Sequence, residues 1–202
     1  MPSSTKTPPV IDFSDFTSGD PAREQKCAQE IRHACVTQGF FQIINHTVPK
    51  DVQKAAFAAS KSFFNLPIQE KLALDKSQNK YNRGYEKSNA QRWEGYEHPD
   101  LKEGFYVGRE LPADHPQVQA GKFGLGPNIW PQTLGESYSD DCLTYLEHCI
   151  TLAQLVTQAL AVSLGYDKHQ FDDFCKDPMA FYKLLHYPPS KARGADGVPT
   201  QQ

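Results

Sequence analysis

The sequence predicts an α+β protein in which helices make up more of the chain than strands. The clearest observation is the apolar periodicity of residues 131–164, which is typical of one long amphipathic helix. Short apolar runs at 9–13, 40–45 and 180–187 are typical of strands, and helical patterns separate them. With 202 residues, the chain is long enough for one or two domains and for a sizeable buried core.

The first expected elements are a short strand and a helix that follow a polar tail. Residues 1–8 are polar and rich in Pro, so we expect a flexible tail, and the first strand is 9–13 (PVIDF). A helix should start at Asp20 and Pro21, because Asp is a preferred N-cap residue and Pro suits the first helical position. Gly39 should end this helix, since Gly readily adopts the left-handed backbone found after helices.

A buried strand and two helices are expected next. Residues 40–45 (FFQIIN) form a nearly continuous apolar run, which is typical of a buried strand. A helix begins near Pro49, and a short helix follows Pro67. The apolar stripe of the first of these helices consists of Val52, Ala56, Ala59 and Phe63. Two pairs of adjacent phenylalanines, at 40–41 and 63–64, are expected to pack in the core.

The remaining elements are loops, a long helix and a last strand. Residues 76–135 lack periodicity but contain many aromatic side chains, so we expect ordered loops with short strands. The helix of 131–164 has an apolar stripe made of Leu143, Leu146, Ile150, Ala153, Val156 and Leu160. A short helix near 169–175 and a strand at 180–187 complete the prediction.

Charge, hydropathy and cysteine usage exclude several classes of protein. The chain has 21 Lys and Arg against 24 Asp and Glu, a net charge of −3, and the two signs are interspersed, which argues against nucleic-acid binding. No segment is long and apolar enough to span a bilayer, and the start, MPSSTKTPPV, lacks the apolar core of a signal peptide. Five cysteines without a C-x-x-C pair fit the free thiols of a cytoplasmic protein.

A series of short motifs runs along the chain in a fixed order. It comprises PVIDF at 9–13, Ala34-Cys35, Gly39-Phe40-Phe41 leading into Asn45-His46, FFNLP at 63–67 with Lys71, Arg83-Gly84-Tyr85, DLKE at 100–103, Asn128-x-Trp130-Pro131, and Leu185-x-Tyr187-Pro188-Pro189. This series resembles the non-haem iron, 2-oxoglutarate-dependent dioxygenases of the isopenicillin N synthase-like branch. The resemblance covers residues 9–189, nearly the whole chain.

The resemblance implies the helix-rich N-terminal region of a double-stranded β-helix (jelly-roll) oxygenase whose catalytic jelly roll is truncated. Its implied parts are the tail 1–8, a non-haem dioxygenase N-terminal domain at 9–130, scaffold helices at 131–178, and the first strand and start of the jelly roll at 179–202.

The resemblance also implies two cofactors, Fe(II) and 2-oxoglutarate. Family members hold Fe(II) with an H-x-D…H triad, which leaves iron positions open for the keto-acid and O₂, and bind the 2-oxoglutarate carboxylate with an Arg-x-Ser. The H-x-D would fall near residue 200, where this sequence has none. We therefore expect neither Fe(II) nor 2-oxoglutarate to bind this chain tightly by itself, and we assign it no catalytic or metal-ligating residue.

Three residues, Arg83, Tyr85 and Tyr187, are predicted to bind the substrate. The resemblance places Arg83 where relatives present an Arg or a nearby polar group to a substrate carboxylate; the alternative is a surface Arg on a loop. Tyr187 matches a Tyr close to the keto-acid or substrate in relatives; the alternative is an ordinary core Tyr at the end of a strand. Tyr85 follows Arg83 in the same motif.

Two histidines, His46 and His98, are candidate metal ligands. His98-Pro99-Asp100 fits the letters H-x-D, but it precedes the long helix and overlaps the DLKE motif, so a surface turn is predicted. His46 is predicted to hydrogen-bond the turn around it.

We expect the N-terminal part of an Fe(II)/2-oxoglutarate-dependent oxidoreductase that acts on a small organic substrate, including a carboxylate-bearing one, and that is inactive as this chain alone. The alternatives are a non-catalytic binding or regulatory module, a partner of a full-length relative, and a metal-binding protein that uses His98, Asp100 and one further His. Most strand neighbours of 180–187 are expected to lie outside the chain, which would leave an edge for self-association.

Overall fold

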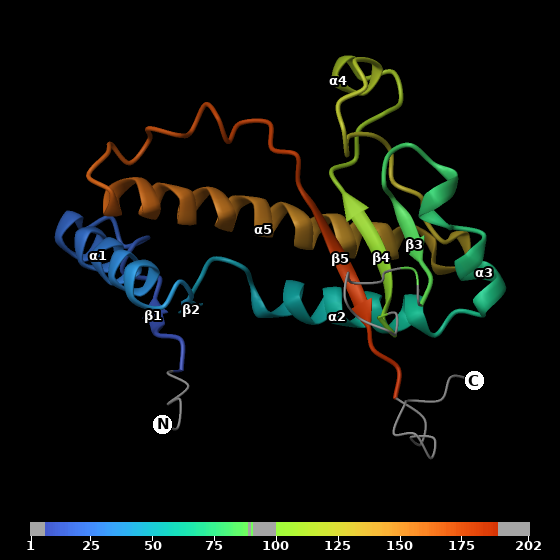
Figure 1. Ribbon diagram of the computed structural model, residues 1–202, viewed down its shortest axis with the longest axis horizontal. Helices are drawn as coiled ribbons and strands as arrows, with labels where there is room; N and C mark the ends of the chain where they lie inside the picture. The colour runs from blue at the N-terminus through green and yellow to red at the C-terminus, as the bar shows by residue number, and fades with distance from the viewer. Residues whose placement is uncertain (1–6, 89, 91–99, 190–202) are drawn as a thin grey trace. The chain divides into compact units, whose positions relative to one another are not determined.

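The computed structural model describes residues 7–88, 90 and 100–189 of the chain. Figure 1 shows its helices and strands in order. They form two compact units, of which the first comprises Met1–Lys50 and Glu147–Pro178 and the second comprises Asp51–Leu146 and Met179–Gln202. Helix α5 (Gly135–Ser163) contributes to both, because its N-terminal half packs in one core and its C-terminal half in the other. The domain boundaries expected at 130 and 178 stay predictions.

The first unit is built on two parallel strands and a capped helix. β1 (Val10–Asp12) pairs in parallel with β2 (Gln42–Ile44). Between them lies α1 (Pro21–Thr37), whose first two free N–H groups donate to the side chain of Asp20 at 2.8 and 3.4 Å. The chain leaves the helix through Gly39, which has a φ of 77°. The first predicted strand and both predicted ends of this helix are confirmed.

Apolar side chains from β1, α1 and the C-terminal half of α5 form the core of the first unit. Its buried members are Ile11, Phe13, Phe16, Cys27, Ile31, Ala34 and Ala159. Phe13 and Phe16 stack with their ring centres 5.5 Å apart. The turns that follow β1 thus place the rings of Phe13 and Phe16 in the same core as the buried side chains of α1.

The prediction that 40–45 forms a buried strand is only partly right. β2 is present, but Gln42 and Ile44 are exposed, because the core covers only the opposite face of the strand, where Ile43 lies. Ile43 and Phe41 pack against the core, whereas Phe40 is 74% exposed. Phe40 follows the turn at Gly39 before the strand begins, so the expectation that it packs in the core is wrong.

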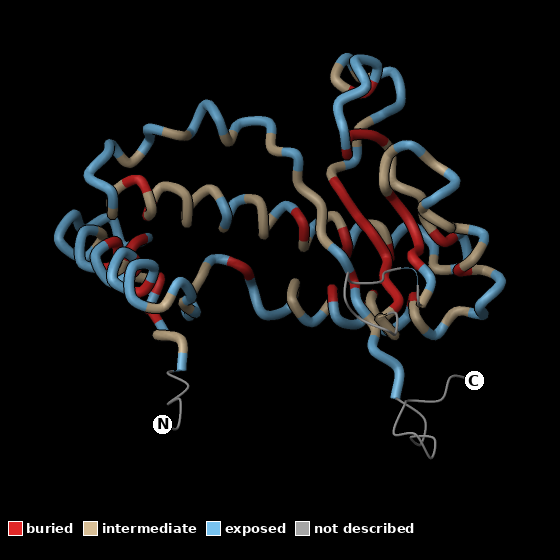
Figure 2. Tube along the Cα trace, in the orientation of Figure 1, coloured by how far each residue is buried: buried red, intermediate tan, exposed pale blue. Residues whose placement is uncertain are grey.

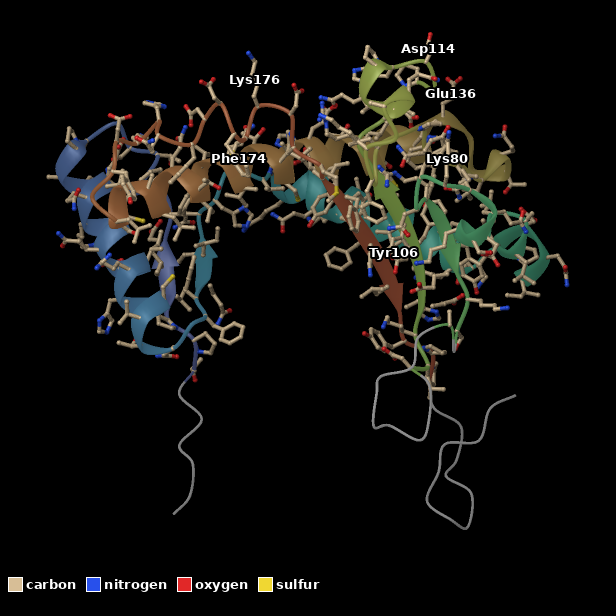
Figure 3. The ribbon with its side chains drawn as sticks, turned by 45° about the horizontal axis from the view of Figure 1, so that its top comes forward. Lys80, Tyr106, Asp114, Glu136, Phe174 and Lys176 are labelled. Carbon is tan, nitrogen blue, oxygen red and sulfur yellow. The ribbon has the colours of Figure 1, made fainter. Side chains whose placement is uncertain are left out.

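The short helix predicted near 169–175 is also wrong, because this segment is a succession of turns. The side chain of Asp167 accepts a hydrogen bond from the N–H of His169 at 2.8 Å, and Asp172 binds the His169 ring. Such local side-chain bonds compete with helical hydrogen bonding. Phe174 is left 88% exposed in this segment (Figure 3).

The second unit combines helices with a three-stranded antiparallel sheet. Its main elements are α2 (Lys50–Phe64), α3 (Ile68–Leu72), β3 (Gly84–Glu86), β4 (Glu103–Gly108), α4 (Pro116–Gln119), the N-terminal half of α5, and β5 (Phe181–His186). Single turns of 3₁₀ helix lie at Lys76–Gln78 and Gln132–Leu134. The strand order is β3-β4-β5. The helices predicted after Pro49 and Pro67 are confirmed. The loops with short strands predicted for 76–135 are confirmed at 76–88 and 100–135, whereas 89 and 91–99 lie outside the described residues.

β4 is the centre of the second unit, and all six of its residues are buried (Figure 2). One face of the sheet packs on α2 and on the first turns of α5, and the rings of Phe63 and Phe105 lie 4.1 Å apart. The buried cluster consists of Ala59, Phe63, Tyr85, Phe105, Val107, Tyr138, Cys142 and Leu184. The predicted stripe of α2 is therefore largely right, with Ala56, Ala59 and Phe63 buried.

The long helix is confirmed as α5, but its predicted apolar stripe is only partly right. Leu146 is buried, whereas Ala153 is exposed. Tyr138 and Cys142 are buried at the start of the helix and Ala159 near its end, and none of these belongs to the predicted stripe. A single stripe fails because the two halves of α5 face different cores.

The predicted strand at 180–187 is confirmed as β5. It pairs with β4 along its whole length, from Phe181 opposite Gly108 to His186 opposite Glu103. The expectation that most strand neighbours of β5 lie outside the chain is therefore wrong for the edge of β5 that pairs with β4. No strand among the described residues pairs with the other edge.

Candidate functional site

A buried carboxylate joins four elements at one end of the sheet. Glu103, the first residue of β4, receives hydrogen bonds from Lys71 Nζ at 2.9 Å and from Tyr85 Oη at 2.7 Å. Its other oxygen lies 2.8 Å from Nδ1 of His186, the last residue of β5. Lys71, on α3, also donates to the carbonyl of Phe64 at 3.3 Å. We call Lys71, Tyr85, Glu103 and His186 the Glu103 cluster.

Electrostatics hold the Glu103 cluster together, and three of its four residues, all except His186, are buried. Burial by itself would raise the pKa of Glu103, but the hydrogen bonds from Lys71, Tyr85 and His186 outweigh it and hold the pKa below the ordinary value. Burial and the neighbouring carboxylate raise the pKa of Tyr85, which keeps its hydroxyl protonated as a donor. The cluster therefore contains one carboxylate, that of Glu103, and three hydrogen-bond donors. These hydrogen bonds connect α3, β3 and β5 to the first residue of β4.

Arg83 is fully buried, so the alternative of a surface Arg on a loop is wrong. Its guanidinium donates to the carbonyls of Tyr81 at 3.0 Å and Gly124 at 2.7 Å, and burial lowers its pKa. A Cβ added at Gly108 would overlap Nη2, so the guanidinium lies directly against the backbone of β4. Among the described residues Arg83 Nε has no hydrogen-bond partner. The described partners of Arg83 are carbonyl groups of the protein itself. The contact between Arg83 and a substrate therefore stays a prediction.

The other two predicted substrate-binding residues lie in opposite environments. Tyr85 is 2% exposed and its hydroxyl is bound to Glu103. Tyr187 directly follows β5 and is 63% exposed, so the alternative of an ordinary core Tyr is wrong. Of the three predicted residues, Tyr187 alone presents its ring to the surroundings, and the substrate roles of both tyrosines stay predictions.

A second charged group lies on the sheet face opposite the helices. Tyr106 of β4 donates to Glu86 Oε2 at 3.0 Å, and Lys76 binds the other oxygen of Glu86 at 2.6 Å. The ammonium groups of Lys76 and Lys183 lie 4.0 and 4.4 Å from the centre of the Tyr106 ring. Figure 3 marks Tyr106 within the sheet. Cations against an aromatic ring are stabilised by its quadrupole, so this group orders the face of the sheet.

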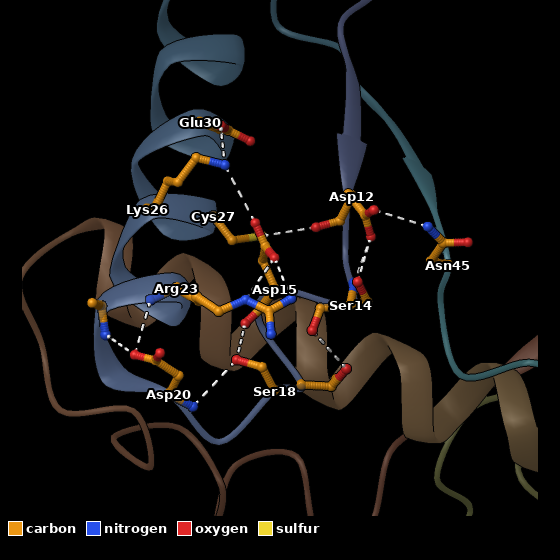
Figure 4. Close-up of polar contacts among 12 residues, drawn as sticks. Asp12, Ser14, Asp15, Ser18, Asp20, Arg23, Lys26, Cys27, Glu30 and Asn45 are labelled. Carbon is orange, nitrogen blue, oxygen red and sulfur yellow. Dashed lines mark hydrogen bonds and ion pairs between the residues drawn. The ribbon is translucent and has the colours of Figure 1, made fainter.

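The polar cluster of the first unit has a structural explanation (Figure 4). Asp15 accepts hydrogen bonds from Arg23 Nη2 at 2.7 Å and from Lys26 Nζ at 3.3 Å, which hold its pKa below the ordinary value. Asn45 Nδ2 donates to Asp12 Oδ2 at 2.9 Å and so ties the end of β2 to β1. These bonds fix the turn between β1 and α1 and leave no convergent set of reactive groups.

The histidine predictions have different outcomes. Nδ1 of His46 accepts the N–H of Val48 at 3.3 Å, which confirms the predicted bond to the turn. His98 and Pro99 lie outside the described residues, and Asp100 is paired with Lys102 at 2.5 Å. In the described ranges no group of three or more His, Cys, Asp or Glu side chains is placed to hold a metal ion. Those ranges therefore do not fit the iron that the family implies.

Comparison with known proteins decides the family. A family model described as the N-terminal region of a non-haem dioxygenase in morphine synthesis matches residues 8–133. The chain belongs to the non-haem Fe(II)/2-oxoglutarate dioxygenases. It corresponds to the N-terminal portion of that family, whose members depend on Fe(II) and 2-oxoglutarate.

Curated relatives match more of the chain than the family model does. The 2-oxoglutarate-Fe(II) type oxidoreductase hxnY of Emericella nidulans is 39% identical over 183 residues, which are 90% of this chain and 52% of that protein. The 2-oxoglutarate-dependent dioxygenase traH of Penicillium crustosum is 39% identical over 186 residues, with 89% and 55% covered. The dioxygenase chain thus spans about half the length of the curated relatives it matches.

Solved structures of dioxygenases share the fold. Neurospora crassa T7H in complex with alpha-KG superposes with a TM-score of 0.76 at 28% identity, over 95% of this chain and 58% of that one. A 2OG-Fe(II) oxygenase family protein from Caulobacter crescentus gives 0.79 at 24% identity, over 95% and 59%. The chain therefore has an α+β fold that it shares with part of these jelly-roll oxygenases. None of the helices in the described ranges has the length and hydropathy needed to cross a membrane.

The Glu103 cluster is the feature that sequence reasoning missed. Lys71 and the DLKE motif carried the family resemblance, yet neither was assigned a role. The available signal was chemical: Glu103 directly precedes the uncharged strand residues GFYVG, and a charge at the start of a buried strand requires a partner.

Proposed function

We propose that this chain is the N-terminal portion of an Fe(II)/2-oxoglutarate-dependent oxidoreductase acting on a small organic substrate, and that residues 1–202 alone do not catalyse the reaction. The observation that carries the proposal is the match of the family model to 8–133, together with relatives that align over about nine-tenths of the chain. The absence of a convergent metal-binding group in the described ranges supports inactivity. The same observation supports weak binding of Fe(II), and we propose that 2-oxoglutarate also binds this chain weakly by itself.

We assign different roles to the three predicted site residues. Tyr187, exposed at the end of β5, contacts the substrate or keto-acid in the complete enzyme. Arg83 and Tyr85 act as positioning residues, because Arg83 donates to the carbonyl of Gly124 and Tyr85 donates to Glu103. The Neurospora structures hold thymine or 5-formyluracil together with alpha-KG, which supports a small substrate here too.

Succinate release tests the proposal directly. The 202-residue protein, supplied with 2-oxoglutarate, Fe(II) and ascorbate, should release no succinate above the protein-free control. Sustained turnover would refute the proposed inactivity. If the reading frame of the mature transcript extends past codon 202, the extended protein should release succinate, and Tyr187→Phe in it should lower kcat/KM. Failure of the extended protein to consume 2-oxoglutarate with any candidate substrate would refute the oxidoreductase assignment.

A non-catalytic module is the second candidate. It is favoured by the apolar core around β4, in which eight side chains of this chain are buried together. A stop codon after codon 202 in the abundant mature transcript would support this candidate. A cytoplasmic location is proposed for either case, because all five cysteines are free thiols.

A further inference from the structure

His186 is the last residue of β5 and directly precedes Tyr187, the residue proposed to contact the substrate or keto-acid. We propose that His186 is a positioning residue, which fixes the place and direction of Tyr187 through its bond to Glu103. The contact between His186 and Glu103 is a feature of the structure alone, whereas the use of Tyr187 in catalysis rests on the proposed function.

His186 is attached to Glu103 by its backbone and by its side chain. The N–H of Arg109 donates to the carbonyl of Ala180 at 3.2 Å, and these two residues oppose each other at the start of the ladder between β4 and β5. In an antiparallel ladder, hydrogen-bonded and non-bonded pairs alternate. Glu103 and His186 lie an even number of steps further along, so their backbones are again a hydrogen-bonded pair. The side chains add the bond of 2.8 Å between Nδ1 of His186 and the carboxylate of Glu103.

The carboxylate that holds His186 is itself fixed. Its other oxygen accepts hydrogen bonds from Lys71 Nζ at 2.9 Å and from Tyr85 Oη at 2.7 Å, and all three of these residues are buried. The ring of His186 also packs against the ring of Phe64 on α2, with the ring centres 5.2 Å apart. A side chain whose hydrogen bond and packing are both supplied by fixed neighbours keeps one orientation.

Alternation along the strand converts the position of His186 into a direction for Tyr187. Successive side chains of a strand point to opposite faces of the sheet. His186 points to the face that α2 covers, so Tyr187 is directed to the opposite face, which carries Tyr106 and Lys183. The next residue is Pro188, and a residue before proline is restricted to extended conformations. The backbone of Tyr187 is therefore restricted from both sides.

Lys102 supports the same placement from the neighbouring strand. Lys102 precedes Glu103 and Tyr187 follows His186, so the register brings Lys102 opposite Tyr187 just beyond the ladder. The hydrogen bond to Asp100 is the main reason why the pKa of Lys102 is raised, and the phenol of Tyr187 adds to this effect. The DLKE motif thus serves the end of β5, because its Glu binds His186 and its Lys lies opposite Tyr187.

Backbone dynamics of the 202-residue protein test the proposal independently of any activity. The order parameter of the Tyr187 N–H, measured by ¹⁵N relaxation, should be about 0.85 in the wild type, which is typical of rigid backbone. His186→Ala removes both the donor and the ring, and should lower this value below about 0.6. The value at Leu184, which lies in the core of the same strand, should stay at about 0.85 in both proteins, so a general loss of folding is detected separately.

Two further variants separate the hydrogen bond of His186 from its ring. His186→Asn retains an N–H donor close to the position of Nδ1 but loses the ring, whereas His186→Phe keeps a ring against Phe64 but has no donor. The order parameter of Tyr187 should stay near the wild-type value in the Asn variant and fall in the Phe variant. A mobile Tyr187 in the wild type, an unchanged Tyr187 in His186→Ala, or equal values in the Asn and Phe variants would overturn the proposal.

Catalysis provides a second test if the reading frame extends past codon 202. In the extended protein His186→Ala should lower kcat/KM by about tenfold or more, because misplacing a contact group is costly even when the changed residue does not touch the substrate. This loss should add little to that of Tyr187→Phe, since a displaced phenol has little contact left to lose. Full additivity of the two losses would overturn the proposal. An extended protein without activity would instead refute the proposed function, and the order parameters would still decide whether His186 fixes Tyr187.

Discussion

Removal of the charge of Glu103 should destabilise the second unit more than any exposed charge change. In Glu103→Gln the buried ammonium of Lys71 keeps its place but loses its counter-ion. The side chains of Glu103 and Lys71 are only 11% and 8% exposed, so solvent does little to replace the lost interaction. Breaking a buried ion pair by changing one partner typically costs about 3–5 kcal/mol. Because Gln retains one acceptor, we expect about 3 kcal/mol.

This destabilisation is large enough to measure by thermal unfolding. For a chain of this size, 1 kcal/mol corresponds to a shift in Tm of about 2–4 °C, so Glu103→Gln should lower Tm by about 6–12 °C. Glu30→Gln is the matched control, because Glu30 pairs with Lys26 at 3.2 Å but the two side chains are 44% and 64% exposed. The control should leave Tm unchanged.

A double-mutant cycle separates the ion pair from simple loss of packing. Lys71→Met together with Glu103→Gln removes both buried charges, so its cost should fall short of the sum of the two single changes by about 2 kcal/mol. Strict additivity, or a Glu103→Gln effect no larger than that of Glu30→Gln, would refute the view that a buried ion pair organises this end of the sheet.

Single contacts give three further predictions. Because the folded-state pKa of Glu103 is depressed, its stabilisation is present above the ordinary value of 4.5 and is lost as the pH falls further, so the urea midpoints of wild type and Glu103→Gln should converge in acid. Asp20→Ala should cost about 1 kcal/mol by removing the N-cap of α1, and Asp20→Asn should cost less. Gly108→Ala should lower the free energy of unfolding by about 2 kcal/mol or more, because the added Cβ would overlap the guanidinium of Arg83. Gly104→Ala should lower it less, because the atom nearest to a Cβ there is 3.4 Å away. Urea unfolding measures both glycine variants.

Elements governed by neighbouring residues were predictable from the sequence. The N-cap at Asp20, the stop at Gly39 and the periodicity of residues 135–163 depend on contacts within one or two helical turns. Where competing local bonds exist, as at Asp167 and Asp172, the short helix predicted near 169–175 does not form. The face that α5 buries was missed for a different reason, since it depends on which partner each half of the helix meets.

The family and the sequence of elements were thus fixed by local patterns and ordered motifs, whereas the site was decided by tertiary structure. Arg83 is a charged residue on a loop in the sequence, yet the carbonyl that binds it comes from Gly124, 41 residues away. Glu103 meets Lys71 across 32 residues and His186 across 83. The cost of burying a charge is offset only when distant segments bring a partner to it, and no periodicity or spacing encodes that partner. The direction of the backbone groups of β5 has the same origin, because pairing with β4 decides which of them face outward.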